Sequence, residues 1–278
     1  MNYTLNCRGK LLVFENPVVM GILNATPDSF YTKGRQNTIA AHLENAGAML
    51  RQGAAVIDVG GMSTRPSAPF VSVQEESDRV LPAIEAIAKE FPEAIISIDT
   101  YRATVAQAAV NAGAAMVNDI SAGDMDADML PTVAALNVPY IATHMQGTPH
   151  TMQQNPLYEN IGLEVLRYFA EKLRQCTLAG IKDVILDPGF GFGKTIAHNY
   201  QLLHHLHVLQ MLECPLLAGV SRKSMIYKLL DTDAEHALNG TTAVHVLALQ
   251  QGAAILRVHD VAEARQCIDI CQYHNQVI

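Results

Sequence analysis

The stretch VVMGILNATPDSF, residues 18–30, joins a continuous apolar run to a polar turn. Apolar runs of this kind, rich in valine and isoleucine, predict strands that are buried on both faces, as parallel strands are. Asn24 ends the run, and Asp28 lies in the turn just beyond it. A Pro–Asp turn is common and would explain a single instance. The fold is therefore decided by whether the pattern recurs along the chain.

The pattern does recur, at residues 54–61, 94–100, 115–121, 139–145, 183–189, 215–221 and 253–260. Amphipathic stretches such as 38–53 and 103–114 lie between these runs, and glycine marks helix ends at Gly53, Gly113, Gly180 and Gly252. Eight strands alternating with helices over about 250 residues predict an α/β protein with a (β/α)8 TIM barrel. An open doubly wound sheet is the competing fold.

The N-terminal residues are predicted to add a short hairpin, over residues 3–14, that closes the bottom of the barrel. No linker or low-complexity segment divides the chain. We therefore expect a single domain over residues 1–278, in which residues 1–16 form the N-terminal hairpin plug. A chain of 278 residues, 49% of them hydrophobic, can bury a sizeable core.

Charge and cysteine content argue against several classes of protein. A formal net charge of −8 disfavours a general binder of nucleic acids or anionic membranes, so an anionic substrate would need a local cluster of basic residues. No apolar run is long enough to span a bilayer, and the N-terminus lacks the apolar stretch of a signal peptide. Five cysteines without CxxC or metal spacing fit a reducing compartment. We expect a cytoplasmic protein with neither nucleic acid nor membrane as a partner.

The eight predicted strands share a polar residue at the carboxyl end. These residues are Asn24, Asp58, Asp99, Asn118, His144, Asp187, Ser221 and, on the last strand, Arg257 with His259. Each one alone is most simply a turn or cap residue. Together they predict a ring of polar side chains at the barrel mouth, where active sites of this fold are built.

Several familiar chemistries do not fit the sequence. No Ser/His/Asp set or G-x-S-x-G motif is apparent, and the turn GFGFGKT, residues 189–195, fails as a phosphate loop because Pro188 replaces the first glycine. It fails as a dinucleotide fingerprint because Lys194 replaces the last one. His204, His205 and His207 are expected mid-helix on a solvated or interface face rather than at a metal site.

The charges on the ring divide into two groups. Asp99, Asn118 and Asp187 offer acceptors and amides that suit a flat heterocycle with N–H edges. Donors that suit phosphate lie on the last two strands, at Ser221, Lys223, Arg257 and His259. The amide oxygen of Asn24 is a reasonable ligand for Mg²⁺, which takes few protein ligands and shares substrate phosphates. The residues thus predict a barrel enzyme that holds a polar heterocycle and a phosphate ester.

The longer motifs resemble the dihydropteroate synthase family along nearly the whole chain. The matching stretches are GILNATPDSF, GGMSTRPSA, SIDTYRATVAQAAVNAGAAMVNDIS, HMQGTPHTMQQNPLY, ILDPGFGFGKTIAHNYQLL, AGVSRKSMI and AAILRVHDV. The resemblance implies a (β/α)8 barrel, a homodimer and Mg²⁺ as cofactor. It also implies the transferase reaction of folate biosynthesis, in which 6-hydroxymethyl-7,8-dihydropterin pyrophosphate and p-aminobenzoate give dihydropteroate and pyrophosphate, and which sulfonamides inhibit.

The resemblance also implies a role for individual residues. The implied pterin pocket consists of Asp99, Asn118, Met145, Asp187 and Lys223. The implied pyrophosphate site consists of Asn24, Arg257 and His259, with the metal at Asn24. The implied p-aminobenzoate site consists of Thr64, Arg65, Pro66, Phe192 and Ser221. The residues expected to carry catalysis are Asp28, Asp99, Lys223 and Arg257.

The chain departs from the family pattern in three loops, at Tyr31, Lys33, Met62, Ser67 and Ala122, none of which is an implied pterin or pyrophosphate ligand. Ala122 stands where the family commonly has glycine. Two alternatives stay open at this stage. One is a methyltransferase-like barrel that binds pterin without a pyrophosphate site, and the other is a non-catalytic pterin-binding paralogue.

Overall fold

Eight parallel strands form one sheet in the computed structural model. The structure describes residues 3–26, 34–62, 70–148, 151–152 and 155–277, and at residues 34–38 it describes the main chain only. The strand order is β8-β7-β6-β5-β4-β3-β10-β9. A bridge between Leu186 on β8 and Leu216, next to β9, joins the two ends of this order. The strands are β3 (Val18–Asn24), β4 (Ala54–Gly60), β5 (Ile95–Asp99), β6 (Met116–Asp119), β7 (Tyr140–Thr143), β8 (Val184–Asp187), β9 (Leu217–Ala218) and β10 (Ile255–Val258). The predicted (β/α)8 barrel is confirmed, and the open sheet is ruled out.

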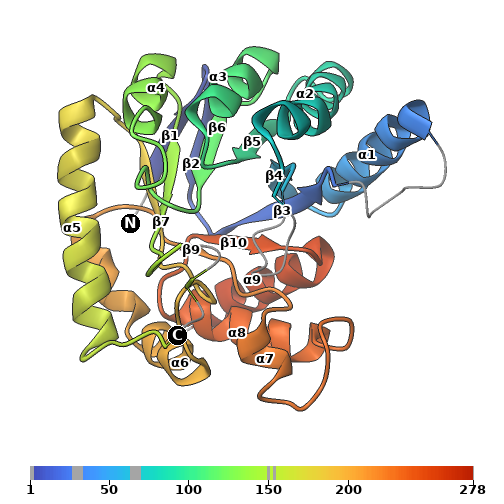
Figure 1. The fold of residues 1–278 in the computed structure, drawn as a ribbon. Coiled ribbons are helices and arrows are strands. Elements are labelled where there is room, and N and C mark those ends of the chain that lie inside the picture. The colour runs from blue at the N-terminus through green and yellow to red at the C-terminus, as the bar shows by residue number, and fades with distance from the viewer. Residues whose placement is uncertain (1–2, 27–33, 63–69, 149–150, 153–154, 278) are drawn as a thin grey trace.

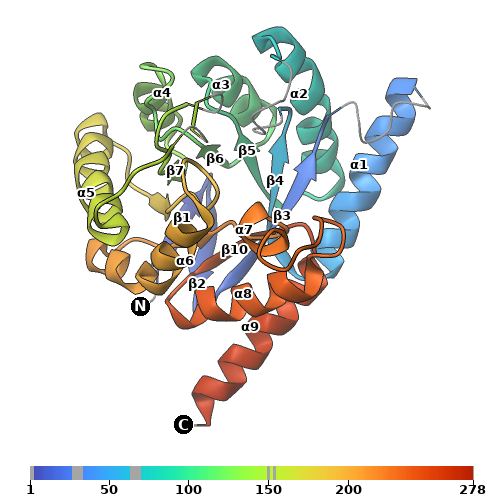
Figure 2. The same ribbon diagram turned by 60° about the horizontal axis from the view of Figure 1, so that its bottom comes forward.

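Helices cover the outside of the barrel (Figures 1 and 2). They are α1 (Gly34–Arg51), α2 (Val73–Glu90), α3 (Ala103–Ala112), α4 (Met129–Leu136), α5 (Ile161–Ala179), α6 (Ile196–His204), the 3₁₀ helix η2 (Leu206–Leu212), α7 (Ser224–Tyr227), α8 (Leu238–Gln250) and α9 (Val261–Gln276). The first helix begins four residues earlier than the expected start at 38, and Gly113 and Gly180 cap α3 and α5 as predicted. None of the described helices is long and apolar enough to cross a membrane.

The expected position of the histidine cluster was wrong in one respect. Helix α6 ends at His204, His205 joins it to η2, and His207 lies in the first turn of η2, so the three do not share one continuous helix. All three side chains are exposed, as a solvated face requires. Within the described ranges, no group of three or more His, Cys, Asp or Glu residues could hold a metal ion.

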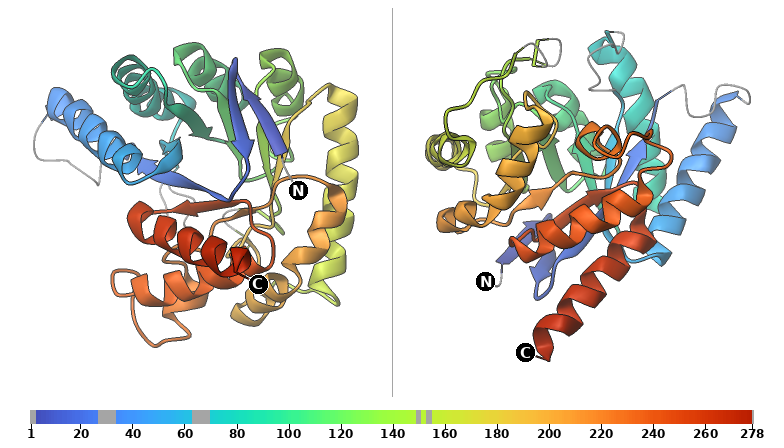
Figure 3. Two further views of the ribbon diagram at one scale, coloured as in Figure 1. Left: turned by 180° about the vertical axis from the view of Figure 1, so that it is seen from behind. Right: turned by 90° about the horizontal axis from the view of Figure 1, so that it is seen from below.

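The N-terminal residues form the predicted hairpin, with β1 (Tyr3–Cys7) antiparallel to β2 (Lys10–Phe14). Alternate side chains of the hairpin face inward, namely Leu5, Cys7, Leu12 and Phe14. They form one apolar cluster with the first interior layer of the barrel, which consists of Met20, Val56, Ile95, Met116, Ile141, Ile185, Leu217 and Ile255. Figure 3 shows the hairpin against this end of the barrel. The hairpin therefore closes the end at which the strands begin and leaves the opposite end for function.

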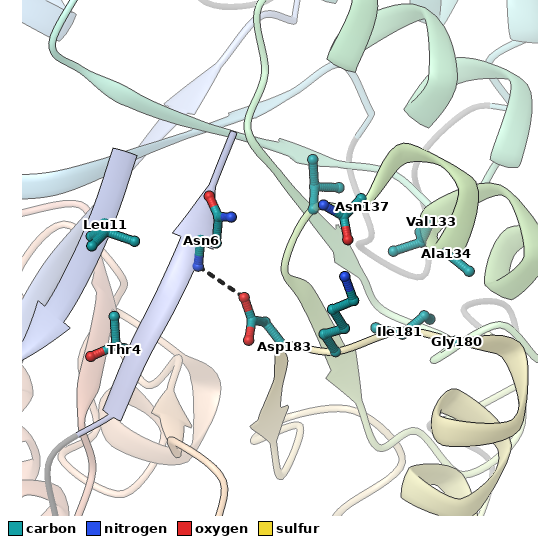
Figure 4. A pocket seen from close by; sticks show the side chains of 11 residues that line it. Thr4, Asn6, Leu11, Val133, Ala134, Asn137, Gly180, Ile181 and Asp183 are labelled. Atoms are coloured by element: carbon teal, nitrogen blue, oxygen red, sulfur yellow. Dashed lines mark hydrogen bonds between the residues drawn. The ribbon is translucent and has the colours of Figure 1, made fainter. Parts of the chain in front are cut away.

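Polar contacts fix the hairpin to the same end. Arg8 Nη1 donates to the carbonyl of Val110 at 2.6 Å, and Lys10 Nζ donates to the carbonyl of Ala94 at 3.0 Å. The main-chain N–H of Asn6 donates to Asp183 Oδ2 at 2.8 Å beside a cavity of about 200 Å³ (Figure 4). The residues lining this cavity from the barrel side precede β7 and β8, so the cavity lies far along the strands from their carboxyl ends.

The two neighbouring leucines of β2 test whether the hairpin stabilises the barrel. Leu12 is 7% exposed, whereas Leu11 is 65% exposed. We expect Leu12→Ala to lower the free energy of unfolding by about 2–5 kcal/mol, because it leaves a cavity under the barrel. Leu11→Ala should change it by less than about 0.5 kcal/mol. Urea denaturation measures both, and equal small losses would mean that the hairpin is dispensable to the core.

Candidate active site at the carboxyl ends of the strands

The described residues of the predicted ring meet at the end of the barrel opposite the hairpin. In the strand register Asn24 lies beside Gly60, Gly60 beside Asp99, and Asp99 beside Asn118, so β3 to β6 present residues at or next to their carboxyl ends at one level. Asp187 ends β8, and Arg257 lies on β10. Parallel strands in register thus bring together side chains that are far apart in the sequence.

An ionic bridge crosses this end of the barrel. Arg257 Nε donates to Asp58 Oδ2 at 2.6 Å, and its Nη2 donates to Asp99 Oδ2 at 2.5 Å. Asn118 Nδ2 donates to the same Asp58 oxygen at 3.0 Å. Asp58 is fully buried, and its Oδ1 has no hydrogen-bond partner among the described residues. One guanidinium group therefore links β10 to β4 and β5, and Asp58 extends the link to β6.

The bridge perturbs the charges that form it. Burial raises the pKa of Asp99 to about 7, although the neighbouring Arg257 favours the ionised form. Burial alone would lower the pKa of Arg257, but Asp58 and Asp99 outweigh it and raise that pKa further above its ordinary value. The arginine is permanently charged, whereas the carboxyl of Asp99 takes up a proton more readily than an ordinary aspartate because its pKa is raised. Perturbed groups of this kind concentrate at functional sites.

A second charged pair faces the same space from β8 and from the segment after β9. A Cβ atom added to Gly219 would lie 3.8 Å from Asp187 Oδ2 and 3.9 Å from Lys223 Nζ, so both charged atoms converge there. Asp187 Oδ1 accepts the main-chain N–H of Gly189 at 2.8 Å, and within the described ranges Oδ2 has no hydrogen-bond partner. Burial lowers the pKa of Lys223 to about 8, and Asp187 opposes that shift.

The glycine-rich turn after β8 packs against the segment after β7. At Gly189, where φ is +70°, a Cβ atom would lie 1.9 Å from the carbonyl oxygen of His144. At Gly193, where φ is +62°, it would lie 2.5 Å from the carbonyl oxygen of Gln146. Close approach of two main chains therefore requires these glycines, which gives the motif a structural explanation that needs no bound phosphate.

The last two strands present a histidine beside the arginine. Ser221 Oγ and His259 Nδ1 are 3.0 Å apart, and Ser221 Oγ accepts the main-chain N–H of His259 at 3.2 Å. Burial and the charge of Arg257 lower the pKa of His259 to about 4. Its ring is therefore neutral at pH 7, and an arriving anion would favour its protonation.

Arg222 holds the segments after β9 and β10 together. It donates to both carboxylate oxygens of Asp260 at 2.8 Å and adopts a left-handed φ of 53°. Sequence reasoning missed Arg222, which lies between Ser221 and Lys223. It included Asp58 in the predicted ring but gave it no role in a binding site; in the structure Asp58 lies two residues before the end of β4.

The remaining sequence-predicted residues fall into two groups. Met145 and Phe192 are half-buried near the rim, and Asn24 is exposed at the end of β3. The other four, Asp28, Thr64, Arg65 and Pro66, lie outside the described residues. Among the departures from the family pattern, Ala122 has φ of 50°, a left-handed conformation that costs alanine about 1 kcal/mol and that glycine adopts freely.

Comparisons with known proteins agree on one family. A sequence profile described as "Pterin binding enzyme" matches residues 20–259. The dihydropteroate synthase of Escherichia coli strain K12 is 44% identical over 270 residues, which cover 96% of this chain and 95% of that protein. The structure of Xanthomonas albilineans dihydropteroate synthase with 4-aminobenzoic acid has a TM-score of 0.93 at 40% identity and covers 100% of both chains. That enzyme in complex with 7,8-dihydropteroate gives a TM-score of 0.89 at 38% identity, with coverage of 99% of this chain and 100% of that one.

Two glycines with left-handed backbone test the close approach in the turn. Gly180 has φ of +94° and open space around its missing Cβ, whereas Gly189 meets a main-chain oxygen. We expect Gly180→Ala to cost about 1–2 kcal/mol of stability from backbone conformation alone. Gly189→Ala should cost more than about 3 kcal/mol, since a main-chain clash is added. Thermal and urea unfolding measure both variants, and similar losses would show that the turn can move away from His144.

Proposed function

The chain belongs to the pterin-binding enzyme family and, within it, to the dihydropteroate synthases, and we propose that its rim divides into a pterin pocket, a pyrophosphate site and an arylamine site. The enzyme is a transferase that condenses 6-hydroxymethyl-7,8-dihydropterin pyrophosphate with p-aminobenzoate, giving 7,8-dihydropteroate and pyrophosphate in folate biosynthesis. We base this division on the hydrogen bonds that the charged side chains of the rim make in the structure without ligand.

The pterin pocket is formed by Asp99, Asn118, Met145, Asp187 and Lys223. Asp187 Oδ1 is anchored by the N–H of Gly189, and Oδ2 makes no hydrogen bond with the described residues, which supports a role for this carboxylate in accepting the N–H edge of the pterin ring. Lys223 converges on the same space and supplies a donor to the ring's acceptors. The half-buried Met145 provides a soft apolar surface for a flat ring.

The pyrophosphate site is formed by Arg257, His259 and Asn24. The observation that carries this proposal is the state of the Arg257 guanidinium, whose Nε and Nη2 are fixed by Asp58 and Asp99. Its Nη1 makes no hydrogen bond with the described part of the chain. A guanidinium that is clamped on one side and open on the other is preorganised for an anion.

The residues present fit a divalent cation that is shared with the substrate. Mg²⁺ is commonly bound through one or two protein oxygens together with phosphate oxygens, and the side-chain amide of the exposed Asn24 offers one such oxygen. We propose Mg²⁺ as the cofactor and Asn24 as its protein ligand. When bound, the ion would neutralise charge on the departing pyrophosphate.

The arylamine site is formed by Phe192 and Ser221 together with Thr64, Arg65 and Pro66, which the resemblance assigns to it. The Phe192 ring lies 4.6 Å from Lys223 Nζ, so an arylamine beside this ring would lie next to the pterin pocket. Asp28 is proposed to order the loop that covers the reacting carbon.

The reaction needs positioning and electrostatics rather than a protein nucleophile. The bond from the exocyclic methylene carbon to oxygen breaks, and its electron pair leaves with pyrophosphate. The lone pair of the neutral arylamine forms the new C–N bond, and the amine then loses a proton to solvent. Asp99 lies beside Arg257 and would stabilise positive charge at the methylene when ionised.

Replacing Arg257 separates the anion site from the pterin pocket. We expect Arg257→Gln to weaken the binding of the pterin pyrophosphate by about 1.5–3 kcal/mol, which is the usual contribution of hydrogen bonds to a charged group. Binding of the same pterin without phosphates should change much less, and this serves as the internal control. Calorimetry with both ligands, below the unfolding temperature of the variant, measures the difference. Equal losses for the two ligands would assign Arg257 a purely structural role.

Removing the proposed metal ligand should change the demand for Mg²⁺. Asn24→Ala is expected to raise the Mg²⁺ concentration for half-maximal turnover on the order of tenfold, while metal-free pterin binding stays intact. Asn24→Asp keeps an oxygen ligand and should retain the low requirement. Asp28→Ala should lower turnover without changing metal demand, because a covering loop acts through closure. An unchanged Mg²⁺ titration in Asn24→Ala would return Asn24 to an ordinary strand end.

We propose that the enzyme is a homodimer in the cytoplasm. All five cysteines are free thiols, in keeping with a reducing compartment. Helices α8 and α9 pack against each other, and α9 extends beyond the barrel (Figure 2). Both helices carry exposed apolar side chains, which supports a protein interface on this face. These side chains are Leu247, Ile270 and Tyr273, which are 45%, 67% and 69% exposed.

Sedimentation velocity tests the proposed dimer. The parent protein at micromolar concentration should sediment as a dimer, and a double variant with Ile270→Glu and Tyr273→Glu should sediment as a monomer, because charge opposes burial of this face. A parent that sediments as a monomer would exclude the dimer. A double variant that remains dimeric would place the interface elsewhere.

A further inference from the structure

Lys194 is a buried lysine to which the catalytic scheme above gives no role. Its side chain is 4% exposed, and its ammonium group has three close acceptors. These are the carbonyl of Gly189 at 2.9 Å, the carbonyl of Phe192 at 3.0 Å and His144 Nδ1 at 2.9 Å. An ammonium group has three N–H donors, so the geometry satisfies the whole group without a carboxylate.

The electrostatics agree with this arrangement. Burial, together with the charge of Lys194, lowers the pKa of His144 to about 2, so the ring is neutral and its Nδ1 can accept. Burial also lowers the pKa of Lys194 to about 7, while Asp187 opposes that shift. Main-chain carbonyl dipoles and a neutral imidazole thus stabilise the ammonium form of Lys194, which burial disfavours.

The hydrogen bonds of Lys194 connect the glycine-rich turn to itself and to the segment after β7. Two of the three acceptors belong to residues 189–192, and the third ties the turn to the segment after β7. Asn199 anchors the turn from α6, because its Oδ1 accepts the N–H of Gly191 at 2.7 Å and its Nδ2 donates to the carbonyl of Lys194 at 3.3 Å. The turn between Gly189 and Lys194 is thus held from two sides by buried polar side chains.

This turn carries the groups that surround Lys223. The carbonyl of Phe190 accepts a hydrogen bond from Lys223 Nζ, and the ring of Phe192 stacks against the same ammonium group. Any change in the turn would therefore move both the surface proposed for the arylamine and the partner of the proposed pterin donor. Lys194 itself donates only to the turn and to His144 among the described residues.

We propose that Lys194 is a positioning residue that holds the Gly189–Gly193 turn in shape and thereby places Phe192 and the Phe190 carbonyl against Lys223. The consequence for catalysis rests on the proposed roles of Phe192 and Lys223. The predicted effect on the shape of the turn does not rest on those roles, because it concerns the protein without ligand. Lysine in this motif serves main-chain carbonyls rather than a nucleotide phosphate.

The absence of tryptophan from the sequence allows a direct measurement of the turn. Phe192→Trp places a single fluorescent reporter on it, and acrylamide quenching reports how well that ring is packed. Lys194→Met in this background keeps the length of the side chain but removes every donor. We expect its quenching constant to rise at least about twofold, since the turn loses the hydrogen bonds to the carbonyls of Gly189 and Phe192 and its tie to His144. Lys194→Gln, a smaller change that keeps two N–H donors, provides a second variant if the methionine variant does not fold.

A matched lysine at the opposite end of the barrel serves as the control. Lys10 also donates to two main-chain carbonyls, of Pro92 and Ala94, and Lys10→Met should leave the quenching of the reporter unchanged. Unchanged quenching in both Lys194 variants would overturn the proposal, and so would an equal rise in Lys10→Met.

Kinetics on the parent that retains Phe192 separate this proposal from the roles assigned to the site. If Lys194 positions the turn and Phe192 contacts the arylamine, Lys194→Met raises the KM for p-aminobenzoate about tenfold or more and lowers kcat less, because the arylamine surface is displaced. Raised quenching with an unchanged KM would support the positioning role and reject Phe192 as an arylamine contact. Unchanged quenching would reject the positioning role whatever the KM.

Discussion

The active end of the barrel depends on one guanidinium group placed between two carboxylates. Arg257 reaches from β10 to Asp58 on β4 and Asp99 on β5, and Asn118 on β6 joins the same Asp58 oxygen. A buried charge that loses its partner typically costs about 3–5 kcal/mol, so removing any charged member leaves the others unsatisfied. The bridge therefore ties β10 to β4 and β5 across the mouth and holds the guanidinium of Arg257 in one orientation.

The two ends of the barrel serve different purposes. At the bottom, the hairpin contributes Leu5, Leu12 and Phe14 to an apolar layer that excludes water. At the mouth, burial lowers the pKa of Lys223 to about 8 and raises that of Asp99 to about 7. Shifted pKa values of this kind are typical of functional sites. A closed apolar bottom and a mouth lined with charges allow one core to support both stability and catalysis.

The sequence predicts the barrel well because each strand repeats one local pattern, an apolar run followed by a polar residue. It predicts the membership of the rim for the same reason, since parallel strands align their carboxyl ends. It does not predict which rim residues pair. Arg257 was assigned only to an anion, whereas it already binds Asp58 and Asp99, and that choice depends on distances across the barrel. Lys194 was considered only within a failed phosphate motif, because its acceptors are main-chain carbonyls that no side-chain pattern reveals.

A double-mutant cycle between Asp58 and Arg257 tests the central claim that Asp58 acts on substrate through the arginine. Calorimetry would measure binding of the pterin pyrophosphate to the parent, Asp58→Asn, Arg257→Gln and the double variant. The account predicts a coupling energy of at least about 1 kcal/mol, with the double variant little worse than Arg257→Gln alone. Strictly additive losses would contradict it, because Asp58 would then contribute to binding independently of the arginine.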